Sequence, residues 1–389
     1  MLLRRPWPRP PRMGALARRR RDPHTMEGMP KDLNAELSAT LRELASAQTV
    51  TFKARVFRRA AAAVLALDRP IDQLLGSQGQ PPDIPGIGPA SWKVILDVLR
   101  GGSSERVERE VAVSRRATDI VRARDARETF LSAAAVRRIL DAPAKAAVIG
   151  RDDYRGDLQM HSVASDGEMT LAALVTACRA RGYSRAAVTD HSHGLHVTRG
   201  VSPDVTRQHR EIDALNRRYD DFRLFKGVEA NIGPDGSVDL DAEALALFEV
   251  VLAAPHSQLR VTTDQTARLL RTVRTRGVHI LAHPRGRQSG TRAGVVADWD
   301  RIFAEAATTG VAMEVDGQPA RQDLDHTLLG RALSAGCVFA LDSDAHSVSE
   351  LAHADYAIAH ARLAGIPTER IVNCWPEDLF EAWLRHRRV

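Results

Sequence analysis

Six short motifs in the second half of this 389-residue chain place a histidine, a glutamate or an aspartate at the end of an apolar run. In chain order they occupy residues 157–162, 189–191, 227–229, 255–257, 282–284 and 342–346. A single histidine after an apolar run is usually a satisfied core or surface residue. The repetition, with helical stretches between the motifs, instead predicts side chains that gather at one polynuclear metal site.

The mixture of imidazole and carboxylate groups indicates which metals such a site would take. Imidazole and carboxylate together suit zinc, manganese or iron, whereas carboxylates alone would favour magnesium or calcium. We therefore expect transition metals.

The elements that must position these motifs alternate between strand and helix from about residue 153 onward. Strands are predicted near residues 156–161, 185–189, 223–230, 250–255, 278–282, 311–315 and 338–341, with helices that include 171–181, 204–218, 263–276 and 298–309. Seven β/α repeats favour an α/β fold in which seven parallel strands close into a barrel and open their carboxyl ends onto one face. An open doubly wound sheet is the alternative, but it would not gather seven strand ends at one place.

The composition, with 44% hydrophobic residues, indicates a soluble globular protein of two domains. No run of about 18 apolar residues is present, so we expect no membrane span. The three cysteines, Cys178, Cys337 and Cys374, are scattered, which fits a reducing cytoplasm and no disulfide framework.

The net charge of +6 comes from the amino-terminal end of the chain. The first 30 residues hold eight arginines against Asp22 and Glu27, and the remaining residues are balanced in charge. We interpret residues 1–29 as a disordered basic tail or an overextended start, because Met26 and Met29 both precede the first helical pattern. A basic arm that binds nucleic acid is the alternative.

Residues 30–101 are predicted to form a small all-α domain. Leucines recur every three or four residues from Leu33 to Leu44, and a second amphipathic run follows them. That second run carries several basic residues, among them Lys53 and Arg58. They either face phosphates or form a solvated helix face.

A glycine-rich turn, Gly86-Ile87-Gly88, leads into the next predicted helix. The two glycines permit a tight turn whose backbone N–H groups can approach a phosphate closely. Pro89 suits the first turn of the helix, whose positive end also favours an anion. The turn and its flanking helices resemble a helix-hairpin-helix motif and the amino-terminal domain of family X DNA polymerases, which implies non-sequence-specific DNA binding through Gly86, Ile87, Gly88, Lys53 and Arg58.

Residues 102–152 are charged, rich in arginine and prone to form helices. About fifty residues cannot hold the fingers, palm and thumb of a polymerase, and no Asp-x-Asp lies on a credible strand there. We interpret this segment as a helical linker and expect no polymerase activity.

From residue 153 to 389 the chain resembles the PHP (polymerase and histidinol phosphatase) family, and above all the PHP domain at the carboxy-terminal end of bacterial family X polymerases. The motifs that carry the resemblance are Asp-Leu-Gln-Met-His-Ser, Val-Thr-Asp-His-Ser, Gly-Val-Glu-Ala-Asn-Ile, Ala-His-Pro and Asp-Ser-Asp-Ala-His. The resemblance implies a distorted PHP-type barrel with two or three zinc, manganese or iron ions. The ligands that it implies are His161, Asp166, His191, Glu229, His256, His283, Asp344 and His346.

The first motif departs from the family pattern, because Gln159 stands where most members have a histidine. Glutamine is a poor zinc ligand and cannot act as an anionic base. One metal position is therefore in question.

The chemistry that the resemblance implies is phosphoester hydrolysis, with Glu229 bridging two metals and Asp344 also at the catalytic centre. Arg285 and Arg287, which follow Ala-His-Pro, could neutralise the phosphate in the transition state, or they could belong to a solvated loop. The loop after the second predicted strand offers three residues that could line the mouth of the site, His193, His196 and Arg199. Asp239, in the acidic loop after the third predicted strand, is expected to take no part.

The leading functional hypothesis is an enzyme of DNA repair that processes DNA ends, as a 3′ phosphatase or a 3′–5′ exonuclease. The second is a small-molecule phosphatase similar to histidinol phosphatase. The third is a DNA-binding scaffold with a degenerate PHP domain, and the intact histidine, glutamate and aspartate positions count against it. We expect a cytoplasmic location.

Overall fold

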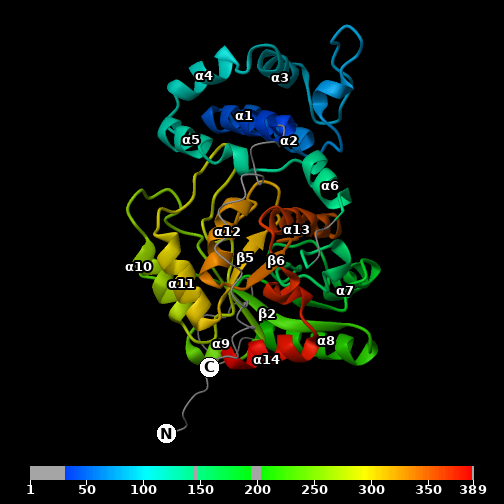
Figure 1. Cartoon of the computed structure of the whole chain (residues 1–389), viewed down its shortest axis with the longest axis vertical. Helices are drawn as coiled ribbons and strands as arrows, with labels where there is room; N and C mark the ends of the chain where they lie inside the picture. The colour runs from blue at the N-terminus through cyan, green and yellow to red at the C-terminus, as the bar shows by residue number, and fades with distance from the viewer. Residues whose placement is uncertain (1–30, 144–146, 194–202, 388–389) are drawn as a thin grey trace.

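A computed structural model describes residues 31–143, 147–193 and 203–387 of the chain (Figure 1). They form two units, a small helical unit from the amino-terminal part and a larger α/β unit beneath it. The predicted tail, residues 1–29, lies outside the described residues. Within the described ranges, no helix has both the length and the apolarity that crossing a membrane requires.

The helical unit is built around α1 and α2, which pack side by side. Its helices are α1 (Leu33–Ala47), α2 (Thr51–Leu65), α3 (Pro89–Gly101), α4 (Glu105–Ala112) and α5 (Ala117–Arg124), with a 3₁₀ turn at Ile71–Leu74. The first helix begins where Asp32 caps it, accepting a hydrogen bond from the N–H of Ala35 at 3.1 Å. Its periodic leucines, including Leu37, Leu41 and Leu44, are fully buried in the core of this unit, as the pattern predicts.

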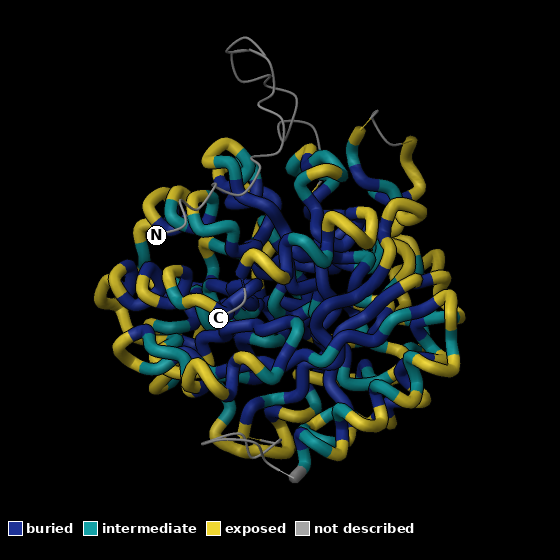
Figure 2. Tube along the Cα trace, turned by 90° about the horizontal axis from the view of Figure 1, so that it is seen from below, coloured by how far each residue is buried: buried dark blue, intermediate teal, exposed yellow. Residues whose placement is uncertain are grey.

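The α/β unit contains a curled parallel sheet whose strands follow one another in chain order. The strands are β1 (Arg185–Val188), β2 (Arg223–Asn231), β3 (Val250–Ala254), β4 (Ile280–Leu281), β5 (Ala312–Asp316) and β6 (Phe339–Asp342). The helices around them are α7 (Leu171–Ala180), α8 (Pro203–Arg218), α9 (Ala242–Leu245), α10 (Thr266–Arg274), α11 (Trp299–Thr309), α12 (His326–Ala335), α13 (Ala354–Leu363) and α14 (Glu377–Arg387). Short 3₁₀ turns lie at Arg127–Thr129, Arg151–Asp153, Val348–His353, Thr368–Arg370 and Val372–Cys374. Figure 2 shows buried segments gathered in the centre of the molecule and exposed ones along its outer turns, which is the pattern of a sheet covered by helices.

The sheet has six strands among the described residues, not the seven that the sequence predicts. Residues 156–161 form an irregular segment beside β1 and the end of β6. The N–H of Ala187 donates to the carbonyl oxygen of Asp157 at 2.9 Å, and the N–H of His161 donates to that of Ala345 at 2.9 Å. The segment therefore occupies the place of the predicted strand without a regular ladder.

Two carboxylates account for this irregularity. Asp342 accepts a hydrogen bond from the N–H of Leu158 at 2.8 Å, and Asp157 accepts one from the N–H of Gln159 at 3.2 Å. Because these backbone groups bond to side chains, they are not available to a strand ladder.

Residues 102–152, predicted as a linker, divide between the cores of the two units. Val107 of α4 and Ile120 of α5 pack into the core of the helical unit. Val136 and Leu140 of α6 (Ala133–Asp141) belong instead to the main core of the α/β unit.

The two units are joined by specific contacts rather than by a free connection. The buried side chain of Gln322 accepts from the N–H of Leu131 at 2.8 Å and donates to its carbonyl oxygen at 2.8 Å. A second contact is the ion pair of Arg260 with Asp119 of α5 at 2.7 Å. The loops at the carboxyl ends of β3 and β5 thus touch the helical part of the chain.

Candidate metal centre

The predicted ligands lie at or just after the carboxyl ends of successive parallel strands. His191 follows β1, Glu229 lies near the end of β2, and His256, His283 and Asp344 follow β3, β4 and β6. Because the strands are parallel, these ends meet at one edge of the sheet. His283 and Asp344 have positive φ angles of 25° and 54°, a backbone conformation that is uncommon for residues other than glycine and concentrates at functional sites.

The carboxylate of Glu229 lies in the middle of the group. Its Oε2 atom is 3.4 Å from Nε2 of His161 and 3.2 Å from Nδ1 of His191. Its Oε1 atom is 3.3 Å from Nε2 of His256 and 2.9 Å from Nε2 of His283. Each carboxylate oxygen of Glu229 therefore faces two imidazoles.

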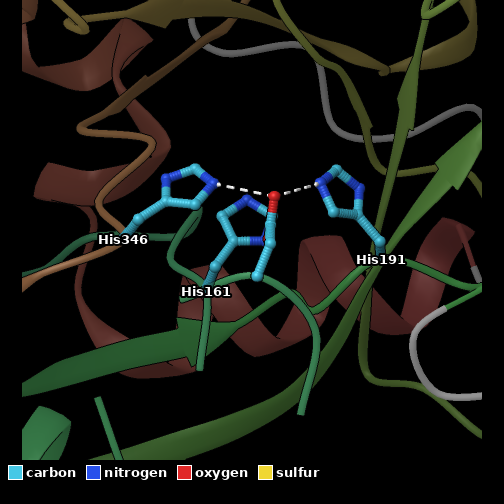
Figure 3. A group of neighbouring side chains, drawn as sticks. His161, His191 and His346 are labelled. Carbon is cyan, nitrogen blue, oxygen red and sulfur yellow. Dashed lines mark ion pairs between the residues drawn. The ribbon is translucent and has the colours of Figure 1, made fainter. Parts of the chain in front are cut away.

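Asp166 gathers a second, overlapping set of imidazoles on the open side of the site. Its Oδ1 atom lies 3.6 Å from Nδ1 of His161, and its Oδ2 atom lies 3.5 Å from Nε2 of His191 and 3.4 Å from Nε2 of His346. Figure 3 shows these three imidazoles around the carboxylate oxygen. Since the Asp166 side chain is 54% exposed, this group borders solvent.

Unsatisfied nitrogen atoms in the group test whether these residues fit a metal. Both ring nitrogens of His161 and Nδ1 of His191 are buried and lack a hydrogen-bond partner in the described structure. A buried polar atom without a partner costs free energy. Imidazole lone pairs beside ionised carboxylates are the donor set of zinc, manganese or iron sites, so the residues fit such ions.

The carboxylates of the group attract a proton when no cation is bound. Burial lowers the pKa of His161, but Asp344, Glu229 and Asp166 outweigh burial and raise that pKa to about 9. A metal ligand must be a deprotonated imidazole, so metal and proton compete for His161.

The two carboxylates nearest this histidine remain ionised although both are buried. Burial raises the pKa of Glu229, but the nearby imidazoles of His256 and His283 lower it well below its usual range. Burial likewise raises the pKa of Asp344, and the nearby guanidinium of Arg321 is the largest influence that lowers it below its usual range.

The side chain of Gln159 bonds to Glu314 and is not one of the groups that gather at the cluster. With its amide oriented so that the nitrogen donates, that nitrogen lies 3.1 Å from Oε2 of Glu314. Glu314 also accepts a hydrogen bond from the N–H of His283, and burial raises its pKa well above the usual range. Gln159 therefore braces the residues behind His283.

The structure places Arg285 and Arg287 differently from the prediction that they face the phosphate. Arg285 pairs with Asp323 at 3.0 Å and with Asp325 at 2.5 Å. Arg287 is fully buried, pairs with Asp325 at 3.0 Å and lies over the ring of Phe130 at 4.0 Å. The guanidinium of Arg287 therefore joins a loop of the α/β unit to the segment before α6, and the prediction is wrong for this residue. Arg285 is held by two buried carboxylates of its own unit.

Arg321, which the sequence did not single out, is the guanidinium beside the cluster. Its Nη1 atom donates to Oδ2 of Asp344 at 2.7 Å and lies 3.4 Å from Asp316. The available signal was its place in the loop after β5, at the same edge of the sheet as the predicted ligands.

Asp325→Asn should lower stability by about 2 kcal/mol, because a neutral amide leaves two buried guanidiniums less well paired. Urea unfolding of the metal-free protein measures this loss. Asp300→Asn is the matched control, since the Asp300 side chain is 71% exposed and pairs with Arg331 on the surface. Equal stability of the two variants would contradict the structural role given to Asp325.

The predicted DNA-binding residues all belong to the helical unit. Gly86 has a φ of 95°, and Gly88 is the N-cap of α3. Ile87 is buried in the core between them, whereas Lys53 and Arg58 are exposed on α2. The tight turn was predicted from its two glycines, and the positive φ explains the need for the first.

One residue of the predicted site mouth lies near the cluster. His193 is exposed, and its ring stacks on that of His191 with centroids 5.2 Å apart. His196 and Arg199 lie outside the described residues.

Comparison with known proteins supports the resemblance drawn from the motifs, although no protein-family model matches the chain. Over 233 residues the chain is 36% identical to the DNA polymerase/3′-5′ exonuclease PolX of Bacillus subtilis, a match that covers 59% of this chain and 41% of the relative. The chain thus spans about two fifths of that relative.

Relatives of another kind match over nearly their whole length. A probable phosphatase of Enterobacter sp. is 27% identical over 248 residues, covering 59% of this chain and 93% of the relative. One of Syntrophotalea carbinolica is 29% identical over 237 residues, covering 56% and 90%. Among solved structures, the histidinol phosphate phosphatase of Lactococcus lactis, complexed with zinc, L-histidinol and phosphate, matches with a TM-score of 0.41 and 18% identity over 54% of this chain and 94% of that one. The chain is homologous to PolX in the region that carries the PHP motifs, and to bacterial proteins described as probable phosphatases.

Proposed function

We propose that the chain is a metal-dependent phosphoesterase that acts on DNA ends, as a 3′ phosphatase or a 3′–5′ exonuclease in DNA repair. The observation that carries the proposal is the convergence of imidazoles on Glu229 and Asp166 at the carboxyl edge of a parallel sheet. Homology to PolX and to probable phosphatases supports the same chemistry. In this proposal residues 153–389 form a PHP barrel domain, with the segment 156–161 in the place of its seventh strand.

When bound, two or three zinc, manganese or iron ions would polarise a phosphate and lower the pKa of a water molecule. The proposed ligands are the eight residues that the PHP resemblance implies. Among them, Glu229 supplies an ionised carboxylate that faces two pairs of imidazoles, and Asp344 is held ionised by Arg321. Arg321 uses Nη1 for Asp344, which leaves Nε and Nη2 to contact a phosphate oxygen and offset its charge.

DNA would be held by residues 30–101 of the helical unit, without sequence preference. Such binding works through phosphates, which exposed basic side chains and free backbone N–H groups can contact. The turn Gly86–Gly88 at the start of α3 offers the backbone groups, and Lys53 and Arg58 offer charge. Residues 102–152 would brace this domain on the barrel.

A small-molecule phosphatase is the second candidate. The observation in its favour is that the probable phosphatases match over 90% or more of their own length. Such a phosphatase therefore needs no helical unit. In this chain the helical unit would then contribute only to packing or to the binding of a partner. A non-catalytic DNA-binding scaffold remains the third reading.

One assay separates these candidates. The purified protein, supplied with manganese or zinc, is offered a 3′-phosphorylated DNA end, a plain 3′-hydroxyl end and histidinol phosphate. We expect hydrolysis at a DNA end and none of histidinol phosphate. The reverse result would favour the small-molecule enzyme, and no hydrolysis of any substrate would favour the scaffold. We also propose that the chain carries out no templated DNA synthesis, which a primer-extension assay tests. We further propose a cytoplasmic location.

Gly88→Val should weaken DNA binding several-fold while hydrolysis of a small chromogenic phosphate ester stays unchanged. A Cβ added at this position meets no protein atom within 4 Å and the φ of −89° is ordinary, so the change should block an approaching phosphate without straining the fold. Fluorescence anisotropy with a short DNA duplex measures the binding.

Gly101→Val is the matched control, at the other end of α3 and also without a protein atom within 4 Å. Gly86 is less suitable for this test, because its φ is positive and an added Cβ would lie 3.3 Å from that of Ala63. If Gly88→Val binds DNA as the control does, the helix-hairpin-helix interpretation is wrong.

A further inference from the structure

His256 is oriented from behind by a neighbouring amide. Its Nδ1 atom lies 2.6 Å from Oδ1 of Asn231. An amide oxygen can only accept a hydrogen bond, so Nδ1 of the neutral ring must carry the proton. The lone pair then lies on Nε2, which is 3.3 Å from Oε1 of Glu229 in the cluster. Asn231 thereby selects the tautomer that a metal ligand needs.

The orientation of that amide is set in turn by Asp239. Oδ2 of Asp239 accepts from the side-chain nitrogen of Asn231 at 2.7 Å, and Oδ1 accepts from its backbone N–H at 2.9 Å. An ionised carboxylate has no hydrogen to donate, so it keeps the amide nitrogen on its own side. The amide oxygen must then face His256.

The same carboxylate reaches the loop of a second histidine. The hydroxyl of Ser192 donates to Oδ2 of Asp239 at 2.8 Å, and the N–H of Ser192 donates to the carbonyl oxygen of Glu229 at 3.0 Å. Ser192 directly follows His191. Asp239 is thus connected to His191, Glu229 and His256, whose ligand atoms all lie within 4.8 Å of one another.

The chain brings Asp239 to this place by a short turn after β2. Ile232 and Val238 form an antiparallel bridge, and the N–H of Asp239 donates to the carbonyl oxygen of Asn231 at 3.1 Å. Asp239 is exposed, so it adds little to the core. Two of its hydrogen bonds, from the side-chain nitrogen of Asn231 and from the hydroxyl of Ser192, lead toward the cluster, which a purely structural surface residue would not need.

We infer that Asp239 is a positioning residue of the metal centre, which holds His256 through Asn231 and the His191 loop through Ser192. The inference rests on the proposed metal chemistry of the site. It replaces the expectation from the sequence that Asp239 takes no part.

The test uses the full chain and titrates cobalt(II) into the metal-free protein, with absorption and competition by zinc as readouts. In Asp239→Asn, an NH₂ group replaces one of the two oxygens that accept hydrogen bonds from Asn231. Whichever way the new amide is turned, its NH₂ group faces either the backbone N–H or the side-chain NH₂ of Asn231. We expect the affinity for at least one ion to fall about 10- to 100-fold, as is usual when a residue that orients a ligand is lost. The unfolding midpoint of the metal-free protein should change little.

A reciprocal exchange of the two side chains distinguishes positioning from a general loss of charge. Asn231→Asp alone sets two carboxylates against each other and should also weaken metal binding. The double variant Asn231→Asp, Asp239→Asn restores an acceptor for His256 Nδ1 and a donor between the two residues. We expect it to recover most of the affinity lost in either single variant.

Asp235→Asn is the matched control in the same turn. Asp235 is exposed, caps Ser237 and pairs with Arg271 at 2.6 Å, without contact to the cluster. Unchanged affinity in Asp239→Asn, an equal loss in Asp235→Asn, or a double variant no better than the weaker single variant would overturn the inference. A chain that binds the ions but hydrolyses no ester would count against the proposed function, while metal affinity would still decide the role of Asp239.

Discussion

Glu229→Gln is expected to lower turnover by at least about a hundredfold, the range found when a group that stabilises charge at a catalytic centre is lost. The substitution keeps the shape of the side chain but removes its charge. Each of its two oxygens faces two imidazoles, so an amide gives up one good donor oxygen and leaves one pair poorly matched. Turnover of a chromogenic phosphate ester and the metal content of the same sample measure the effect.

The fold should barely register this change, since the sheet core is formed by apolar strand residues. Glu211→Gln, on the exposed face of α8, removes the same charge away from the cluster and should leave turnover unchanged. Near-normal turnover in Glu229→Gln, with its metals retained, would remove Glu229 from the cluster and with it the bridged-metal chemistry.

The gathering of the cluster could be predicted because it depends on local sequence and on one topological rule. Each of the residues His191, Glu229 and His256 comes at the end of a short apolar run that forms a strand, and parallel strands bring such ends to one edge. The prediction needed no knowledge of which strands are neighbours, since the sheet follows chain order.

The failures have a common physical cause, which is pairing between groups far apart in the chain. Residues 156–161 look like a strand, yet Asp342, nearly two hundred residues later, takes the N–H of Leu158. Arg287 looks like a phosphate-binding residue of its loop, yet Asp325 and the ring of Phe130 enclose it. Neither partner leaves a signal in the local pattern.

The same cause explains why Asp239 and Arg321 were missed. Asp239 lies only eight residues after Asn231, but its role depends on contacts with two other loops. Ser192 bonds to Asp239 directly, and His256 bonds to Asn231. Arg321 acquires its role from Asp344, on the next strand end. Residues that orient ligands are identified by their hydrogen bonds, and a single sequence does not record these.

The double variant His191→Ala, His346→Ala is expected to lose most of the two or three ions that we propose for the site. The four ligand atoms of His161, Asp166, His191 and His346 lie within 4.8 Å of one another, so the variant removes half of that group. His191 also belongs to the second group, with Glu229 and His256. Loss of a ligand shared by both groups should therefore weaken binding at both. Elemental analysis after gel filtration gives the number of ions per chain.

The control double variant, His193→Ala with His209→Ala, removes two imidazoles that neither group includes and should retain full metal content. It separates loss of ligands from loss of histidine in general. His193 is a strict choice for this control, because its ring stacks on that of His191. If His193 were also a ligand, the control variant would lose metal. Full metal content in His191→Ala, His346→Ala would contradict the ligand assignment. The ions, if any, would then lie elsewhere, and the convergence of imidazoles on Asp166 would have to be explained as hydrogen bonding between a carboxylate and protonated histidines.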